Sequence, residues 1–387
     1  MSSAQRNSAQ AQPLPVGSTL GVFGGGQLGR MFAQAAEQMD YKVHVYCPEV
    51  DCPAGQIAAW HTQADYHDFQ AIAEFAQQVA GVTLEFENVP VAAAEAVAYY
   101  VPVCPNGEVL YTVQDRSREK GFLTGAGVPC AAYRYVRTAE ELHRGIADVG
   151  CPAVLKTTKF GYDGKGQIVI QRADESEEAW ARLGKHKCVL EQFVPFAREI
   201  SVLVARGADG AIETFGPMEN THANHILDLS VYPAATDAVV AQQAIVAARR
   251  VATELDLVGI ACVEFFETVE GEVLVNEIAP RPHNSGHLTI EASTTSQFEQ
   301  QVLALVGRPL GKMEAPRPAA MANLLGDLWA NGEPAWDRVA DYPGVVLHLY
   351  GKHAARPGRK MGHLTALADS PEEAAKWVLA ARRAVVQ

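Results

Sequence analysis

Two strand-like segments, 258–268 and 272–278, flank a turn that contains Gly271. Glycine adopts positive φ angles at no steric cost, so this pattern predicts a tight β-hairpin. With a two-residue loop that ends at Gly271, counting outward along both strands places Glu264 directly opposite Glu277. The fold must therefore accommodate two acids on one face of a sheet.

Directly opposed residues have Cβ atoms roughly 5 Å apart, where like charges repel. Cys262 and Phe266 flank Glu264 on the same face, which favours a site with little water. Two unneutralised acids are costly there, and a hard cation with oxygen ligands removes the cost. The alternative is an exposed hairpin whose acids are simply solvated. The hydrophobic neighbours favour a magnesium site at Glu264 and Glu277.

The bulk composition is that of an ordinary globular protein. The chain has 387 residues, of which 48% are hydrophobic and 20% are charged, and this length suggests two or three domains. A net charge of −13 argues against nucleic acid as the main partner. No segment approaches the ~18 consecutive apolar residues of a membrane span. We expect a soluble protein with no membrane partner.

The cysteines and the N-terminal segment bear on the compartment. Seven cysteines occur, at positions 47, 52, 104, 130, 151, 188 and 262, without CxxC or Cys/His zinc spacing. This pattern favours reduced thiols in the cytoplasm. Residues 1–17 are rich in Ser, Ala, Gln and Pro and lack the apolar core of a signal peptide, so we expect a disordered tail.

Three blocks follow this tail. Residues 18–112 alternate between strand and helix patterns, which predicts a parallel sheet with right-handed crossovers. Residues 113–312 begin with a charged helix start and contain the hairpin. Residues 313–387 carry a strand, a basic turn and a closing helix, and the Pro/Gly-rich stretch 307–318 is the expected linker.

A glycine turn lies between the first strand and the first helix. Gly24–Gly29 fits the G-x-G-x-x-G pattern, whose backbone N–H groups can bind an anion at a helix N-terminus. A dinucleotide site also needs an acid at the end of the second strand, but Glu49 and Asp51 come only after Pro48. The turn therefore favours another phosphate over a nicotinamide cofactor, and a purely structural turn remains an alternative.

A second glycine-rich segment, 156–167, begins with Lys156 at the end of an apolar strand. Its spaced glycines and Lys165 are typical of a mobile cationic flap over a triphosphate, although the Walker spacing is missing. The alternative is a long solvated hairpin. Farther along, Glu191 and Glu199 are candidates for adenosine contacts, or else ordinary surface acids.

The segment 276–287 leaves the second strand of the hairpin as a proline-broken polar loop. It contains His283 and His287, but Pro282 and Gly286 make a helical zinc pair improbable. A rigid polar loop beside a metal site is more plausibly a substrate clamp.

Taken together, these motifs resemble ATP-grasp ligases, in particular the 5-(carboxyamino)imidazole ribonucleotide synthetases of bacterial purine synthesis. The matching segments are 26–31, 83–88, 161–167, 191–192, 276–287, 350–352 and 358–363. The resemblance implies a chain of α/β and α+β domains: an N-terminal Rossmann-like domain, an ATP-grasp domain with a lid at about 150–195, and a small C-terminal domain.

The resemblance also implies an activity. Such enzymes use ATP and two Mg²⁺ ions to activate bicarbonate as carboxyphosphate, and then carboxylate the amine of 5-aminoimidazole ribonucleotide. The implied partners are these small molecules, and a homodimer is usual in the family.

Residue roles are implied position by position. The ATP contacts would be Arg116, Lys156, Gly161, Tyr162, Asp163, Gly164, Lys165, Gly166, Gln167, Glu191, Gln192, Phe193, Val194, Glu199, His222, Asn276 and Glu277. The catalytic groups around the imidazole and bicarbonate would be Asp163, Lys165, Arg281, His283 and Asn284. The ribonucleotide would contact Gly26, Gln27, Leu28, Glu85, Glu87, Tyr162, Lys352, Arg359 and Lys360. Glu264 and Glu277 would hold magnesium, in agreement with the hairpin argument.

Two positions depart from the family pattern. Lys165 stands where arginine is frequent, which keeps the charge but loses a bidentate fork. The segment 217–222 is one residue shorter than usual, which leaves the role of His222 open.

Three competing functions remain. A formate-using glycinamide ribonucleotide transformylase is disfavoured by the 281–287 loop and by the region around Lys352. A nicotinamide oxidoreductase is disfavoured by the missing acid. A non-catalytic nucleotide sensor would not require both metal carboxylates.

Overall fold

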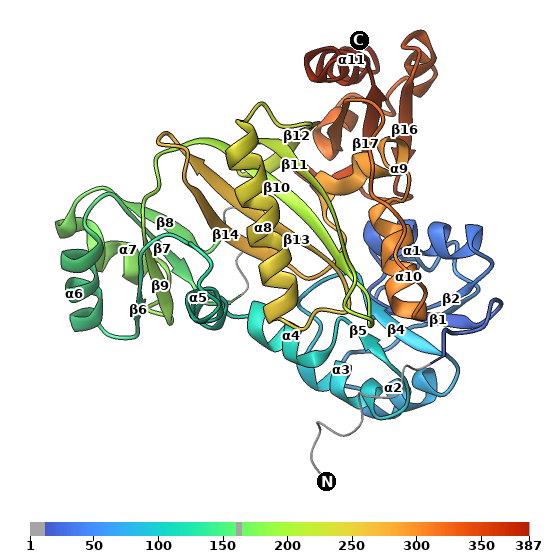
Figure 1. The fold of residues 1–387 in the computed structure, drawn as a ribbon, viewed down its shortest axis with the longest axis horizontal. Coiled ribbons are helices and arrows are strands. Elements are labelled where there is room, and N and C mark those ends of the chain that lie inside the picture. The colour runs from blue at the N-terminus through green and yellow to red at the C-terminus, as the bar shows by residue number, and fades with distance from the viewer. Residues whose placement is uncertain (1–11, 160–164, 387) are drawn as a thin grey trace.

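The computed structural model describes residues 12–159 and 165–386 of the chain. Within them the strands form sheets of five, eight and four strands, which belong to three lobes of the molecule (Figure 1). Among the described helices, none is long and apolar enough to cross a membrane.

The N-terminal lobe contains the five-stranded parallel sheet in the order β3-β2-β1-β4-β5. Its strands are β1 (Thr19–Phe23), β2 (Lys42–Tyr46), β3 (Trp60–Thr62), β4 (Gly81–Leu84) and β5 (Val103–Cys104). Its helices are α1 (Gln27–Gln38), α2 (Phe69–Ala76), α3 (Val91–Ala98) and α4 (Gly107–Val113). The parallel sheet predicted for this block is confirmed, although β3 was not foreseen because it is only three residues long.

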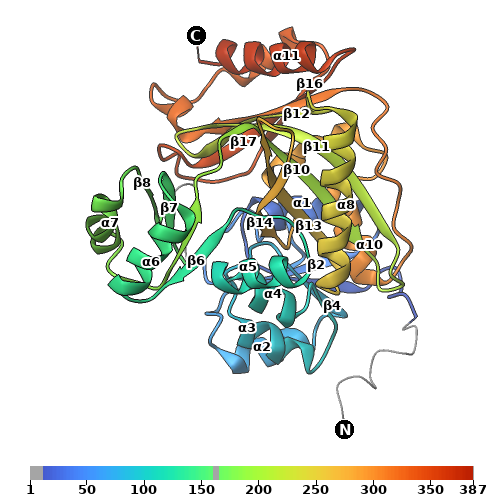
Figure 2. The same ribbon diagram turned by 60° about the vertical axis from the view of Figure 1, so that its left-hand side comes forward.

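The large antiparallel sheet has the order β14-β13-β10-β11-β12-β15-β17-β16. Its strands are β10 (Phe196–Arg206), β11 (Ile212–Ala223), β12 (Ile226–Tyr232), β13 (Gly259–Thr268), β14 (Val273–Ala279), β15 (Ala319–Leu325), β16 (Val345–Leu349) and β17 (Lys360–Leu367). The helix α8 (Ala238–Glu254) packs on one face of β10, β11 and β13 (Figures 1 and 2). Because β12 pairs with β15, one sheet runs from the central block into the C-terminal block.

The smallest sheet forms the lobe at the left of Figure 1, in the order β6-β9-β7-β8. Its strands are β6 (Tyr133–Val136), β7 (Ala153–Thr157), β8 (Gln167–Ile170) and β9 (Cys188–Gln192). The helices α6 (Ala139–Val149) and α7 (Ser176–Arg182) bury its core on one side, while α5 (Arg116–Gly125) leads from the N-terminal lobe into it.

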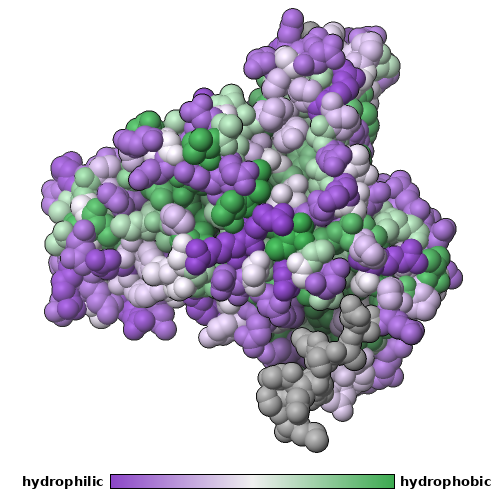
Figure 3. Space-filling view, in the orientation of Figure 1, coloured by the Kyte–Doolittle hydropathy of each residue, from purple (hydrophilic) through white to green (hydrophobic). Residues whose placement is uncertain are grey.

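One helix connects the N-terminal lobe to the large sheet, and a second helix covers the C-terminal end of that sheet. The helix α10 (Gln297–Val306) packs on α1 and β4 of the N-terminal lobe as well as on β10 and β13. The C-terminal helix α11 (Pro371–Ala384) packs on β15 and β17, and Arg382 pairs with Asp228 of β12 at 2.6 and 3.1 Å. The short helix α9 (Thr289–Ala292) precedes α10. On the face shown in Figure 3, a band of hydrophilic side chains interrupts the hydrophobic areas.

The inner end of the expected disordered tail lies within the described residues. The Leu14 N–H donates to Val306 O at 2.8 Å, and Leu14 packs against the core of the N-terminal lobe. Residues 12–17 therefore make defined contacts, because Leu14 supplies an apolar side chain that composition averaged over the segment conceals. Residues 1–11 lie outside the described part.

Candidate functional site

The hairpin of β13 and β14 pairs Glu264 with Glu277, which confirms the predicted register. The loop and the strand pairing that produce this register differ from the prediction. The Thr268 N–H donates to Glu272 O at 2.9 Å, so the loop is one residue longer than expected, although Gly271 does have a positive φ of 81°. A β-bulge between Glu264 and Phe265 compensates, because it inserts Asn276 into the return strand.

The two paired carboxylates differ in exposure. The Glu264 side chain is 15% exposed and the Glu277 side chain is 48% exposed, so the water-poor environment predicted for both exists only at Glu264. Burial and the nearby charge of Glu277 raise the pKa of Glu264 to about 8. A divalent cation beside the pair would relieve this repulsion, and carboxylate oxygens are the ligands that Mg²⁺ prefers. The donor set therefore fits the ion.

A group of buried ion pairs lies beside the bulge. The Lys156 ammonium on β7 contacts Glu191 on β9 at 3.0 Å and donates to the Asn276 side chain at 3.4 Å. Lys120 on α5 contacts the same Glu191 oxygen at 3.6 Å and donates to the backbone oxygen of Asn276 at 3.1 Å. Burial opposes ionisation of Glu191, but the two lysines outweigh it and lower its pKa. The lid sheet, α5 and the hairpin thus meet at one set of charges.

Residues at the start of α5 also belong to this group of charges. Arg116 donates to Thr157 O at 3.2 Å and lies 4.0 Å from Glu277. Its neighbour Glu119 accepts from the Ile278 N–H at 2.7 Å, and burial raises the pKa of Glu119 to about 7. Sequence reasoning selected Arg116 and missed Glu119 and Lys120. The charged pattern at the start of this helix was visible, but nothing in it indicated that these two side chains would be buried.

A chain of hydrogen bonds holds His283 against Glu264. Its Nε2 lies 3.1 Å from Glu264 Oε1, and its Nδ1 lies 2.9 Å from the Ser285 hydroxyl. Burial and the charge of Arg281 hold the pKa of His283 well below its usual range, so the ring is neutral.

The chain continues from Ser285 to Ser201 at 2.9 Å, to the Asn220 amide at 2.9 Å and to Ser230 at 2.8 Å. The Asn220 amide donates to Ser201, so each hydroxyl can donate toward His283 in turn. Nδ1 is then the acceptor, and Nε2–H donates to Glu264.

His222, whose role the sequence left open, lies at the far side of the same carboxylates. Its Nδ1 is 2.7 Å from Glu199 Oε2. Burial would lower the pKa of His222, but the hydrogen bond with Glu199 raises it overall. The structure therefore brings these two predicted ATP contacts together.

The glycine turn of the N-terminal lobe is occupied by a side chain of the protein itself. Glu85, just after β4, accepts from the Gly26 N–H at 2.9 Å and from the Gly29 N–H at 3.2 Å. A Cβ at Gly24 would lie 2.1 Å from Glu85, and Gly24 has a φ of 110°, so only glycine fits there. Helix α1 begins inside the Gly24–Gly29 motif, directly after Gly26, which leaves Gln27 half-buried and Leu28 buried in its first turn.

The second acid of this segment has a different partner. Glu87 forms a two-contact ion pair with Arg281, one contact being Nη2 to Oε1 at 3.1 Å. Burial opposes the charge of Glu87, but Arg281 holds its pKa below the usual range. Both Glu85 and Glu87 are therefore engaged within the protein. Asn284, in the same loop as Arg281, is buried, and both its side-chain polar atoms lack a hydrogen-bond partner among the described residues.

The three predicted phosphate-binding cations of the C-terminal block lie together, with Lys352 near Glu85 and Lys360 near Glu87. Lys352 donates to the backbone oxygen of Lys360 at 2.7 Å, and Arg359 donates to Ala354 O at 2.9 Å. Burial, together with the charge of Arg359, lowers the pKa of Lys352 to about 8, while Glu85 acts in the opposite direction. Residues from the first and last blocks thus share one electrostatic environment.

The central part of the predicted flap, Gly161, Tyr162, Asp163 and Gly164, lies outside the described residues. Within them, Gln167 pairs with Lys156 across β7 and β8, Gly166 has a φ of 74° and Lys165 is exposed. After β9, Gln192 and Phe193 are exposed and Val194 is buried.

Helix α10 is the largest element of the site that sequence reasoning missed. Gln297 donates to His283 O and accepts from the His283 N–H, both at 2.8 Å. One turn later, Gln301 donates to Thr83 Oγ1 at 2.9 Å and to Leu84 O at 3.0 Å. One helix therefore fixes the His283 loop and the end of the strand that leads into Glu85. Two glutamines four residues apart were the available signal, but any polar helix face gives the same pattern.

Comparison with known proteins agrees with this arrangement. Three family models match: the ribonucleotide synthetase preATP-grasp domain at residues 18–114, the ATP-grasp domain at 121–298, and the phosphoribosylaminoimidazole carboxylase C-terminal domain at 319–376. The N5-carboxyaminoimidazole ribonucleotide synthase of Bacillus subtilis is 43% identical over 94% of this chain and 94% of its own. A bifunctional purine synthesis protein of Dictyostelium discoideum is 41% identical over 91% of this chain, which spans only 37% of that longer protein.

Solved structures give the same result. An N5-carboxyaminoimidazole ribonucleotide synthetase in complex with ADP is 40% identical, with a TM-score of 0.91 over 96% of this chain and 97% of that one. The Aspergillus clavatus synthase in complex with ADP and 5-aminoimidazole ribonucleotide is 30% identical, with a TM-score of 0.87 over 96% of this chain and 99% of that one. The full-length similarity and the paired carboxylates show that the chain belongs to the N5-carboxyaminoimidazole ribonucleotide synthase family of ATP-grasp ligases.

Proposed function

We propose that the protein uses ATP, bicarbonate and Mg²⁺ to carboxylate the amine of 5-aminoimidazole ribonucleotide, through carboxyphosphate. One observation carries this proposal: the hairpin bearing Glu264 and Glu277 lies between two different charged groups. On one side are Lys156, Lys120 and Glu191. On the other are Arg281, His283 and the cations of the C-terminal block.

The first group suits the triphosphate. Lys156 projects from the strand that leads into the flap, and its ion pair with Glu191 fixes its position. Mg²⁺ held by Glu264 and Glu277 would neutralise charge on the phosphates during transfer. Arg116, between Glu277 and the flap strand, adds positive charge at the same place.

The second group suits the bicarbonate and the aminoimidazole. Arg281 offers a planar set of donors to a carboxylate-like group, and its pair with Glu87 fixes the plane. The neutral His283 ring is oriented by Ser285. Asn284 supplies an amide whose polar atoms have no partner among the described residues and are free for a substrate.

The ribonucleotide phosphate is assigned to the space between the glycine turn and Lys352, Arg359 and Lys360. Supporting this, Glu85 accepts from the Gly26 N–H at the start of α1 and also acts on the pKa of Lys352, as do Arg359 and Lys360. The complex of the Aspergillus clavatus relative with ADP and 5-aminoimidazole ribonucleotide supports two separate small-molecule sites in this fold. It also favours carboxylation over the formate-dependent alternative.

Measuring ADP release with 5-aminoimidazole ribonucleotide, with and without bicarbonate, tests the proposal. We expect ADP release and formation of an acid-labile carboxylated product to depend on both substrates and on Mg²⁺. ADP release driven by formate and glycinamide ribonucleotide would instead establish the transformylase reaction. The family resemblance further leads us to propose a cytoplasmic homodimer, which sedimentation of the purified protein and fractionation of cells would test.

A further inference from the structure

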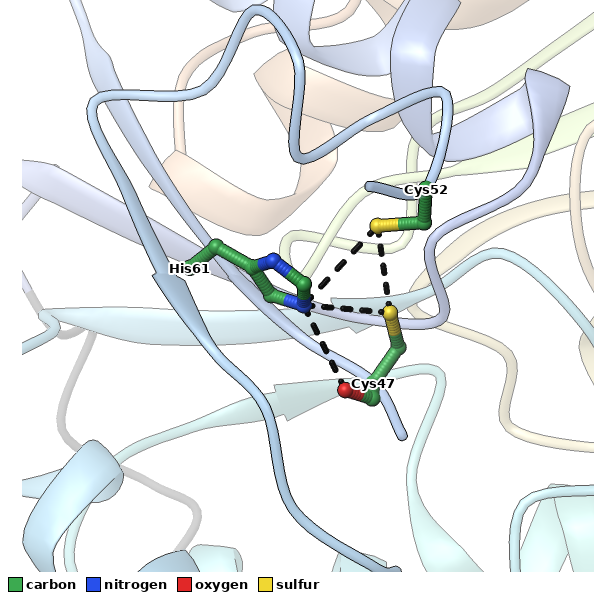
Figure 4. Close-up of side chains that lie close together, drawn as sticks. All are labelled: Cys47, Cys52 and His61. Atoms are coloured by element: carbon green, nitrogen blue, oxygen red, sulfur yellow. Dashed lines mark hydrogen bonds between the residues drawn. The ribbon is translucent and has the colours of Figure 1, made fainter. Parts of the chain in front are cut away.

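Two cysteines and a histidine converge beside the glycine turn, on the side away from Glu85. Cys47 follows β2, Cys52 lies in the next loop, and His61 belongs to β3, which pairs with β2 (Figure 4). The two Sγ atoms are 3.2 Å apart, and His61 Nε2 lies 3.3 Å from Cys47 Sγ and 3.8 Å from Cys52 Sγ. Both cysteines are buried and His61 is half-buried. The three potential ligand atoms therefore lie within 3.8 Å of one another, and His61 Nε2 also lies 3.3 Å from Cys47 O.

This donor set has a definite chemical preference. Two sulfurs and an imidazole suit zinc and other thiophilic cations, whereas Mg²⁺ requires oxygen ligands. With metal–sulfur bonds of about 2.3 Å and metal–nitrogen bonds of about 2.0 Å, tetrahedral ligand atoms lie roughly 3.5–3.8 Å apart. The three observed separations, 3.2, 3.3 and 3.8 Å, already lie close to that range. Shifts of about half an ångström or less would bring them into it.

The two sulfurs lie in a closely packed, polar environment. The Cys52 sulfur accepts from the Cys47 thiol at 3.2 Å and from the Gly55 N–H at 3.3 Å. The site is also enclosed by backbone, since a Cβ at Gly25 would lie 2.4 Å from both sulfurs. Glycine at this position lets the turn pass directly against the sulfur pair.

We propose that Cys47, Cys52 and His61 form a zinc-binding site, separate from the magnesium carboxylates. Three protein ligands leave a fourth position for water. Sequence spacing gave no sign of this site, because the cysteines are five residues apart and the histidine comes from a neighbouring strand.

Because of its position, a metal bound at this site would affect the loop that surrounds it. Loop 47–61 contacts the glycine turn through Gly25 and reaches the C-terminal block, where Gln56 Nε2 donates to Gly351 O at 2.9 Å. Lys352 is the next residue. A bound zinc ion would therefore stiffen the loop that connects the two halves of the phosphate site assigned above.

Cobalt is the probe for testing this site, because thiolate-to-cobalt charge transfer reports sulfur ligands and is silent for carboxylates. The full-length protein is reduced, stripped with a chelator and titrated with Co²⁺ in excess Mg²⁺, which occupies the Glu264 and Glu277 carboxylates. We expect one equivalent to give the charge-transfer band and to be displaced by Zn²⁺. Competition with a chromophoric chelator then gives the zinc affinity.

Variants separate this site from general thiol binding. Cys52→Ser should abolish the charge-transfer band, and His61→Gln should weaken zinc binding more than about 100-fold, beyond the usual cost of losing a supporting contact. Cys188→Ser is the matched control, since Cys188 is buried in the core of the lid and its thiol donates to His186 O at 3.3 Å, and it should bind zinc like the wild type. Circular dichroism checks the fold, and the half-buried His61 variant decides the matter if the Cys52 variant unfolds.

Two results would overturn the proposal. One is a reduced wild-type protein that takes up no cobalt with a charge-transfer band, as expected if the two thiols only hydrogen-bond to each other and to His61. The other is unchanged zinc affinity in His61→Gln. Neither readout uses turnover, so failure here leaves the proposed ligase activity untouched, and failure of that activity leaves this site untouched.

Discussion

At the scale of single residues, Glu264 and Glu277 differ in solvent exposure, and this difference suggests a different role for each carboxylate in binding a cation. Glu264 is enclosed and contacts His283, whereas Glu277 faces the open side near Arg116. A cation held by both would be fixed by the first and accessible to a triphosphate at the second.

Glu277→Gln should therefore retain the fold yet lose nearly all ATP turnover, because one ligand charge for Mg²⁺ disappears. Steady-state ADP release at varied Mg²⁺ measures this loss. Glu270→Gln is the control, since Glu270 is exposed on the same hairpin and lies outside the site. Wild-type activity of Glu277→Gln at limiting Mg²⁺ would contradict the metal assignment.

Lys352 offers a test through pH. Its pKa is lowered to about 8, so the ammonium loses its proton as pH rises through 8, and attraction for a phosphate is lost with it. The KM for 5-aminoimidazole ribonucleotide should rise above pH 8 while the KM for ATP stays flat. Lys352→Arg keeps its charge, so its ribonucleotide KM should vary less with pH.

Lys352→Ala should lower kcat/KM for the ribonucleotide roughly ten- to a hundredfold at neutral pH, the usual cost of one charge-assisted contact. A variant whose ATP KM rises instead would show that the C-terminal cations serve the triphosphate.

Residue-level prediction from the sequence succeeded where spacing along a strand determines proximity. The Glu264–Glu277 pair was found because strand residues alternate, although the longer loop and the bulge at Asn276 cancelled in the count. It failed where proximity depends on packing between elements, as for Lys120 against Glu191. No local pattern shows which lysine of a charged helix will be buried.

At the scale of elements, the hydrogen-bond chain that crosses the large sheet ties β12 to the His283 loop. It begins at Ser230 and passes through Asn220 and Ser201 before it reaches Ser285. This hydrogen-bond chain ends on Nδ1 of His283, so it supports the tautomer in which Nε2 faces Glu264.

Ser285→Ala should lower kcat with little change in the KM for ATP, since Nδ1 of His283 loses its principal partner. We expect a loss of roughly tenfold or more, by analogy with other groups that orient a functional histidine. Ser293→Ala removes a serine hydroxyl just beyond α9 that is not part of this hydrogen-bond chain, and should leave kcat unchanged. Equal effects of the two substitutions would mean that the chain does not orient His283.

At the scale of the whole molecule, the continuous sheet makes the C-terminal block part of the central fold. Strand β15 pairs with β12, and Arg382 on α11 binds Asp228 on β12. The domain boundaries at residues 112 and 312 remain predictions from sequence. Composition reveals a Pro/Gly-rich linker such as 307–318, but it cannot show that a sheet continues across that linker.

Removing residues 313–387 should therefore cause association rather than yield a stable shorter enzyme. The truncation exposes the whole edge of β12, and unpaired strand edges recruit other chains. Size-exclusion chromatography and light scattering of the truncated protein measure this. A monomeric, cooperatively folding truncation would show instead that the block is an independent domain.

The carboxylate of Glu85 has a further consequence for selectivity. It already accepts from the Gly26 and Gly29 amides at the start of α1, so an anion that used these two amides would have to displace a tethered competitor whose effective concentration is high. We therefore expect singly charged anions such as chloride and bicarbonate to compete poorly with Glu85 for these amides. A phosphate monoester carries nearly two charges and could also contact Lys352 and Arg359, so we expect the turn to select for it.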